Sequence, residues 1–138
     1  MSTPSVPRAA LLIVAFALAA LAAAVHVYIW WLESVAWTTP AGRKVFRTSQ
    51  EEAETTRFLA FNQGYDNLAL AILVLLGIVI ELAVAPQVGL TLVVAGTAIM
   101  LFAALVLASA SPAHRQAALH QGAFPAPTLA AIAVHGAL

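Results

Sequence analysis

The feature that most constrains this chain is the length of its apolar runs. Residues 9–32 carry no charged side chain apart from His26, and about 20 apolar residues in a helix cross the hydrocarbon core of a bilayer. Further apolar stretches cover residues 64–84, 88–110 and 123–138. Because hydrocarbon offers no partner to a free backbone amide, such stretches fold as helices. We therefore predict an all-α membrane protein with four transmembrane helices in a single domain, residues 1–138.

Composition agrees with this fold class and excludes several functions. The chain is 62% hydrophobic and only 9% charged, whereas a soluble domain carries about 25% charged residues. Its six basic and six acidic residues cancel, so we predict no nucleic-acid partner. The absence of cysteine excludes disulfides, thiolate metal ligands and cysteine nucleophiles. The alternative for residues 9–32 is a signal peptide, but the run exceeds the core of roughly 7–15 residues that such peptides have.

The polar segments between the apolar stretches predict the connections. Thr-Pro-Ala-Gly-Arg at 39–43 predicts a turn. Ser49 and Glu52 have the spacing of a capping box, so a helix should begin there and lie on the membrane surface within the loop 38–58. Gly64 is a natural place for a bend before this helix enters the bilayer. Pro86 should end the second span, and residues 109–122 predict a second polar turn.

The distribution of Lys and Arg predicts the orientation. Five of the six basic residues fall in the loops after the first and third spans: Arg43, Lys44, Arg47, Arg57 and Arg115. Only Arg8, in a short polar head at residues 2–8, lies on the other side. Because basic residues stay on the cytoplasmic side, both loops should be cytoplasmic and both termini outside. The basic side chains are then also placed to contact anionic lipid.

Two parts of the chain resemble each other. Thr-Pro-Ala-Gly-Arg at 39–43 is similar to Ser-Pro-Ala-His-Arg at 111–115, and Asn-Gln-Gly at 62–64 is similar to His-Gln-Gly at 120–122. Each pair lies after an odd span and before an even one. This pattern indicates two helix hairpins in the same orientation, related by an axis along the membrane normal. Chance similarity in an Ala- and Leu-rich background is the alternative.

Polar and aromatic side chains gather at the predicted cytoplasmic ends of the helices. Residues spaced by three, four and seven share one helical face, and an ionisable group in the bilayer costs about 2.5–3.5 kcal/mol unless it faces the bundle interior. One interpretation is a cytoplasm-facing pocket; the other is a clasp of hydrogen bonds between helices, each contributing about 0.6–2 kcal/mol. The candidate residues are His26, Trp30, Glu33, Trp37, Asn62, Gln63, Tyr65, Asp66, Asn67, His120 and Gln121.

Several functions are compatible with this cluster. The leading hypothesis is binding of a small amphipathic or lipid-like molecule, because an acid beside aromatic rings attracts a cation or an amine. An intramembrane isomerase or hydrolase using His26 with Glu33 or Asp66 as acid and base is the second. The third hypothesis is an oligomeric transporter or channel, and the fourth is an accessory subunit of a membrane complex. We expect membrane lipids and further copies of the chain as partners.

A metal site is an alternative for four of these residues. His26, Glu33, Asp66 and His120 offer nitrogen and oxygen ligands, but no tight ligand motif such as Glu-x-x-His occurs. We therefore predict neither a metal nor another cofactor.

The order of these motifs resembles the domain-of-unknown-function family 1304 of small bacterial integral membrane proteins. The resemblance rests on His-Val-Tyr-Ile at 26–29, Glu33, Trp-Thr-Thr-Pro at 37–40, Gly-Arg-Lys-Val-Phe at 42–46, Asn-Gln-Gly at 62–64, Asn67 and Gln-Gly-x-x-Pro-Ala at 121–126. It implies four helices in the bacterial cytoplasmic membrane and brings no established reaction. One departure is Tyr-Asp-Asn at 65–67, where the family is expected to read closer to Leu-Tyr-Asn. Asn67, rather than Asp66, is therefore the expected family residue.

Overall fold

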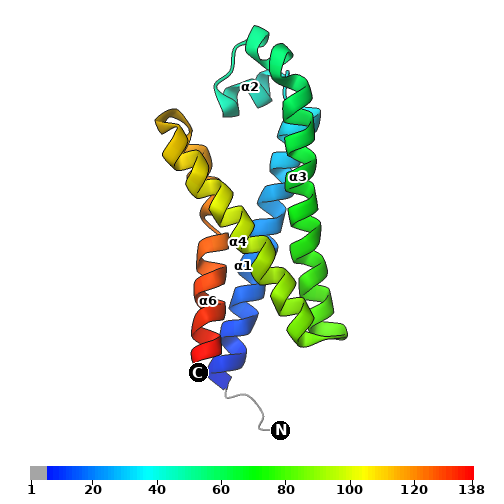
Figure 1. Ribbon diagram of the computed structural model, residues 1–138, viewed down its shortest axis with the longest axis vertical. Coiled ribbons are helices and arrows are strands. Elements are labelled where there is room, and N and C mark those ends of the chain that lie inside the picture. Colours follow the sequence, from blue (N-terminus) through cyan, green and yellow to red (C-terminus); the bar gives the residue numbers. More distant parts are fainter. Residues whose placement is uncertain (1–5) are drawn as a thin grey trace.

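The computed structural model describes residues 6–138, and helices follow one another along this range (Figure 1). Residues 1–5, which belong to the predicted polar head, lie outside the described residues. The elements are α1 (Val6–Trp30), a π-helix η1 (Trp31–Val35), α2 (Pro40–Phe46), α3 (Gln50–Ala83), α4 (Pro86–Ala110), a 3₁₀-helix η2 (Pro112–His114), α5 (Arg115–Gly122) and α6 (Pro125–Ala137). Three stretches are long and apolar enough to cross a membrane: Pro7–Val35, Gln50–Ala83 and Pro86–Ala110. The predicted helical, multi-pass class is confirmed at this level.

The first helix continues three residues beyond the predicted end of its span. After Trp30 the backbone widens into η1, where the amide of Ala36 donates to the carbonyl of Trp31 at 2.9 Å. This bond joins residues five apart, as in a π-helix, and π-turns inside longer helices are frequent at functional sites. The π-turn places Glu33 in the last apolar turn of the helix.

The predicted capping box at the start of α3 is confirmed. The Ser49 hydroxyl accepts from the Glu52 amide at 3.1 Å, and the Glu52 carboxylate accepts from the Ser49 amide at 2.8 Å. From there α3 runs for 34 residues, about 50 Å at 1.5 Å per residue. The surface helix and the second span are therefore one continuous helix, and the bend expected at Gly64 does not interrupt it. Gly64 is buried against the first helix instead.

The segment 39–43 is not the turn that its Pro and Gly predict. Thr39 caps α2, its hydroxyl accepting from the Gly42 amide at 3.3 Å, and Pro40 occupies the first helical position. Proline is favoured there because the first amides of a helix lack internal partners. Arg47, in the left-handed conformation with φ 54°, ends this short helix.

Helices α3 and α4 form a hairpin whose backbones touch. A Cβ atom on Gly77 would lie 2.9 Å from the Gly89 carbonyl oxygen and the Val93 amide nitrogen, so only glycine fits there. Beyond this point α4 crosses the bundle obliquely, and its C-terminal part diverges from α3 (Figure 1). Helix α6 packs on α1, and the start of α1 and the end of α6 lie at the same end of the molecule.

The polar turn predicted for residues 109–122 is mostly helical. The chain turns at Ser111 and η2, and α5 then packs back against α4. Gly122 approaches α4 so closely that an added Cβ would lie 3.2 Å from the Ala104 Cβ. Contacts of this kind between distant segments can override local propensity, so a segment whose polar composition predicts a turn can still be helical.

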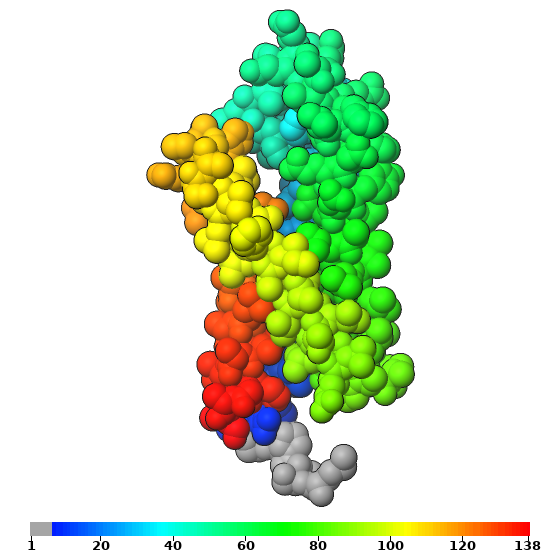
Figure 2. Space-filling model, viewed as in Figure 1, coloured from blue at the N-terminus to red at the C-terminus, as the bar shows by residue number. Residues whose placement is uncertain are grey.

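The core is built mainly from small side chains on crossing helices. It lies where α1, α3 and α4 meet and consists of Phe16, Ala19, Ala22, Ala23, Ala71, Val74, Val93 and Met100. Small residues let helix backbones approach closely, which is how helices pack within membranes. The molecule is more open toward the end that carries α2, where Figure 2 shows a gap between the C-terminal part of α4 and the start of α3.

Candidate functional site

The centre of the candidate site is a hydrogen bond between two buried polar side chains. Glu33 is 4% exposed and Asn67 is 7% exposed. The Asn67 amide nitrogen Nδ2 donates to Glu33 Oε2 at 2.8 Å and to the Gln63 backbone carbonyl at 3.1 Å. The bond connects η1 to α3 across 34 positions of sequence. It holds the Glu33 side chain at the wall between the first and third helices.

A close helix contact fixes the height of this hydrogen bond. An added Cβ on Gly64 would overlap the Ser34 hydroxyl and would lie 3.1 Å from the Glu33 Cβ. The same hydroxyl donates to the Phe61 backbone carbonyl at 2.9 Å. Ser34 and Gly64 therefore bring η1 and α3 together one turn from Asn67, and any larger residue at 64 would push Glu33 away from its donor.

Two aromatic contacts involve residues close in sequence to Glu33 and Asn67. The Trp30 and Tyr65 rings meet edge to face with centroids 6.1 Å apart. Trp37 packs against Phe46 of α2 with centroids 4.8 Å apart, and its indole nitrogen Nε1 donates to Thr56 Oγ1 at 3.1 Å. The second arrangement orients the Trp37 ring and attaches α2 to the bundle.

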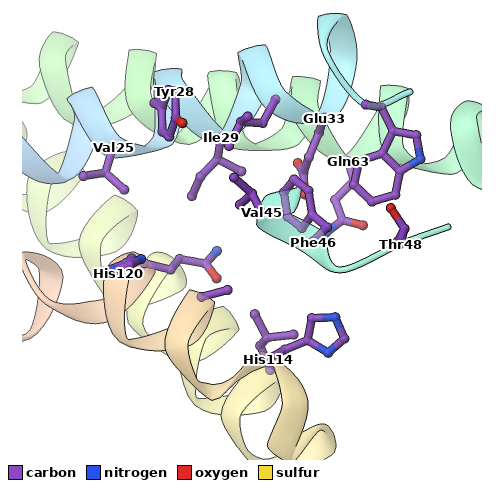
Figure 3. Close-up of a pocket in the computed structure, with 15 residues that line it drawn as sticks. Val25, Tyr28, Ile29, Glu33, Val45, Phe46, Thr48, Gln63, His114 and His120 are labelled. Carbon is purple, nitrogen blue, oxygen red and sulfur yellow. The ribbon is translucent and has the colours of Figure 1, made fainter. Parts of the chain in front are cut away.

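A cavity of about 270 Å³ opens next to Glu33. Figure 2 shows the hollow between the C-terminal part of α4 with α5 and the segment that contains α2 and the start of α3. The Glu33 side chain comes from one wall, together with Ile29, Phe46 and others, while His114 and His120 come from the facing wall (Figure 3). Most of the lining surface is apolar, and Glu33 is the only acid that lines the cavity within the described chain.

The structure places the predicted residues in three groups. One group lines the cavity and comprises Glu33, Trp37, Gln63, His120 and Gln121. Asn67, Trp30 and Tyr65 do not line the cavity: Asn67 donates to Glu33, and the Trp30 and Tyr65 rings contact each other. The remaining three, His26, Asn62 and Asp66, neither line the cavity nor contact Glu33 by a hydrogen bond that the structure shows.

His26 is buried in the helix bundle. Its side chain is 0% exposed, and Nδ1 lies 2.8 Å from the Ala22 carbonyl oxygen of its own helix. Because a carbonyl only accepts, Nδ1 carries the proton in this bond. The other ring nitrogen, Nε2, finds no hydrogen-bond partner within the described chain. Two candidates on α3 lie instead at the surface: Asp66 is exposed, and Asn62 Nδ2 donates to the Phe58 carbonyl one turn away.

Sequence reasoning missed several lining residues. His114 lies in what was predicted to be a polar turn, and its Nδ1 is 2.6 Å from the Ser111 hydroxyl. Val45 and Phe46 belong to α2, which was predicted as a turn followed by a loop. The available signal was the pair of apolar residues at 45–46 between basic residues at 43–44 and 47, because a helix at a membrane surface combines basic and apolar side chains.

The four side chains that offer metal ligands in the sequence analysis do not lie together in the structure. Among residues 6–138, no group of three or more His, Asp or Glu side chains is arranged to hold a metal ion. His26 lies inside the bundle, Asp66 on its surface, and His120 on the wall opposite Glu33.

Comparison with known proteins places the chain in a family. The family model described as "Protein of unknown function (DUF1304)" matches residues 20–133. The chain belongs to the DUF1304 family. The matched range contains Glu33, Asn67, Gly64 and the residues that line the cavity. Neither the curated proteins nor the solved structures contain a significant match to this DUF1304 chain.

Proposed function

We propose that this DUF1304 protein crosses the bacterial cytoplasmic membrane four times, with both termini outside. The fourth span is formed by α5 and α6 together, because α6 alone has 13 residues, about 20 Å, which is too short for the hydrocarbon core of about 30 Å. The two ends of the described chain lie on one side (Figure 1). The opposite side carries the five basic residues of the two connecting segments, the pattern of a cytoplasmic face.

The function that the geometry supports best is binding of a small amphipathic or lipid-like molecule in the cavity beside Glu33. The observation that carries this proposal is the Glu33 carboxyl group, which is buried in a largely apolar lining. Asn67 binds one of its oxygens from behind, and a carboxylate accepts further hydrogen bonds. A ligand with a cationic or hydrogen-bonding head and an apolar body matches this arrangement.

The aromatic wall favours a cationic head over a neutral one. Trp37 and Phe46 pack against each other beside Glu33 and line the cavity. Indole and phenyl faces attract cations by about 0.5–2 kcal/mol, which adds to the attraction of the acid. A catalytic role for His26 with Glu33 or Asp66 has less support, because His26 is inside the bundle and neither His26 nor Asp66 lines the cavity.

The proposal is tested by equilibrium binding of a long-chain alkylamine to the purified full chain, followed by tryptophan fluorescence. Glu33→Gln should weaken binding about 10- to 100-fold, because a hydrogen bond to a charged partner contributes about 1.5–3 kcal/mol. The glutamine keeps an oxygen that accepts from Asn67, so the fold should be retained. Glu54→Gln, at an exposed position on α3, is the matched control.

Three results would contradict this function. One is equal binding of an alkyl sulfate and the alkylamine by the wild type. Another is equal weakening by Glu33→Gln and Glu54→Gln, which would indicate only a diffuse surface charge. The third is unchanged binding in Glu33→Gln, which would leave the Glu33–Asn67 pair as a structural clasp.

A further inference from the structure

A second groove lies along the hairpin of α4 and α5 and is separate from the cavity beside Glu33. It has a volume of about 520 Å³. One side is a stripe on α4 that includes Leu101, Leu105 and Ala108, spaced by four and three residues, and the other side includes Leu119 of α5. From residue 101 to 108 the stripe extends about 10 Å. The groove is therefore a mostly apolar furrow between α4 and α5.

The groove is closed at one end and polar at the other. Gly122 and Ala104 bring the two helices into contact, since an added Cβ on Gly122 would lie 3.2 Å from the Ala104 Cβ. Near the chain turn, the Arg115 side chain lines the groove, and its Nε donates to the Ala108 carbonyl at 3.4 Å. This bond uses one of the five guanidinium donors, so the others remain to bind a ligand at the polar end.

The charge of the groove has one sign. Arg115 is permanently cationic, and the only other titratable side chain in the lining is His120. No acid lines the groove within the described chain. An anionic group is therefore favoured at the polar end, whereas the cavity beside Glu33 favours a cation.

The exposure of the groove indicates what kind of molecule reaches it. Leu105 and Leu119 are 60% and 66% exposed. Leu105 is on α4, which is long and apolar enough to cross a membrane, and Leu119 is an apolar residue on the more polar α5. In a membrane such side chains face acyl chains, and basic groups at the ends of membrane helices bind anionic lipid headgroups. An anionic phospholipid combines an apolar chain with an anionic head, and the bilayer supplies it at this position.

We propose that the α4–α5 groove binds one anionic phospholipid, with an acyl chain between Leu105 and Leu119 and its phosphate on Arg115. The groove is distinct from the cavity beside Glu33, and the two have opposite charge preference. His120 lines both, so bound lipid also supports the helix that forms one wall of the cavity.

The test is native mass spectrometry of the full chain with phosphatidylglycerol and phosphatidylcholine of the same acyl chains. The wild type should retain phosphatidylglycerol more strongly. Arg115→Gln should lower that affinity about fivefold, because one basic residue near the membrane surface contributes about 1 kcal/mol, and should leave phosphatidylcholine unchanged. Arg115→Lys should restore most of the difference, and glycerol phosphate alone should not bind.

Arg57→Gln is the matched control, since Arg57 is exposed on α3 and does not line the groove. Equal affinity of the wild type for both lipids would overturn the proposal. Equal loss in Arg57→Gln and Arg115→Gln would overturn it too, because the binding would then follow overall charge. A protein dimer in place of lipid adducts would show that a second copy of the chain covers the groove.

Discussion

Replacing Asn67 by leucine tests how Glu33 is held. The change preserves most of the side-chain volume but removes the Nδ2 donor that lies 2.8 Å from Glu33 Oε2. Loss of the donor leaves a buried carboxyl oxygen unsatisfied, which costs about 1–3 kcal/mol. We expect Asn67→Leu to lower the free energy of unfolding by this amount. Asn62→Leu should change it by less than about 0.5 kcal/mol, because Asn62 is exposed and its amide binds a carbonyl of its own helix.

The measurement is equilibrium unfolding of each variant by a denaturing detergent in mixed micelles, followed by far-UV circular dichroism. Adding Glu33→Leu completes a double-mutant cycle, and pairs of this kind in membrane proteins couple by about 0.6–1.7 kcal/mol. The reasoning is refuted if Asn67→Leu destabilises no more than Asn62→Leu. It is also refuted if the double variant loses the sum of the two single losses, since the side chains would then not interact.

Two further predictions concern packing and capping. Gly64→Ala should destabilise the protein by about 1–3 kcal/mol, because its Cβ would overlap the Ser34 hydroxyl. Gly136→Ala, where a Cβ meets nothing within 4 Å, should be neutral or slightly stabilising in the same unfolding assay. Equal effects of the two substitutions would argue against the close contact at Gly64. Ser49→Ala should lower the free energy of unfolding by about 0.5–2 kcal/mol through loss of the helix cap. Ser109→Ala should change it by less than about 0.5 kcal/mol. Hydrogen exchange should show fraying of the first turn of α3 in Ser49→Ala and not in Ser109→Ala.

Much of the fold follows from local rules that the sequence displays. The capping box at Ser49 is set by residues three positions apart. The burial of Glu33 follows from the cost of leaving an acid in hydrocarbon, which favours the bundle interior. Asn67 belongs to the polar cluster that the sequence predicts, and its amide donates to Glu33.

The remainder depends on contacts between segments that are distant in sequence. The π-turn at Trp31–Val35 has no local signal, and it shifts the face on which later residues lie. Helix α5 has the polar composition of a turn, but the approach of Gly122 to Ala104 allows it to pack as a helix. His26 shares a helical face with Glu33 but lies seven residues earlier, about 10 Å along the helix, and it is buried in the bundle rather than at the cavity.

The central claim, that an amphiphile occupies the cavity beside Glu33, is tested most directly by thiol protection. The chain has no cysteine, so a single introduced thiol reports without background. Gln121 lines the cavity, whereas Gln116 lies on the same helix outside it. A saturating alkylamine should slow maleimide labelling of Gln121→Cys and leave Gln116→Cys unchanged. In the Glu33→Gln background, the same protection should need about 10- to 100-fold more amine. Equal labelling rates with and without the amine at Gln121→Cys, or equal slowing at both positions, would contradict the claim.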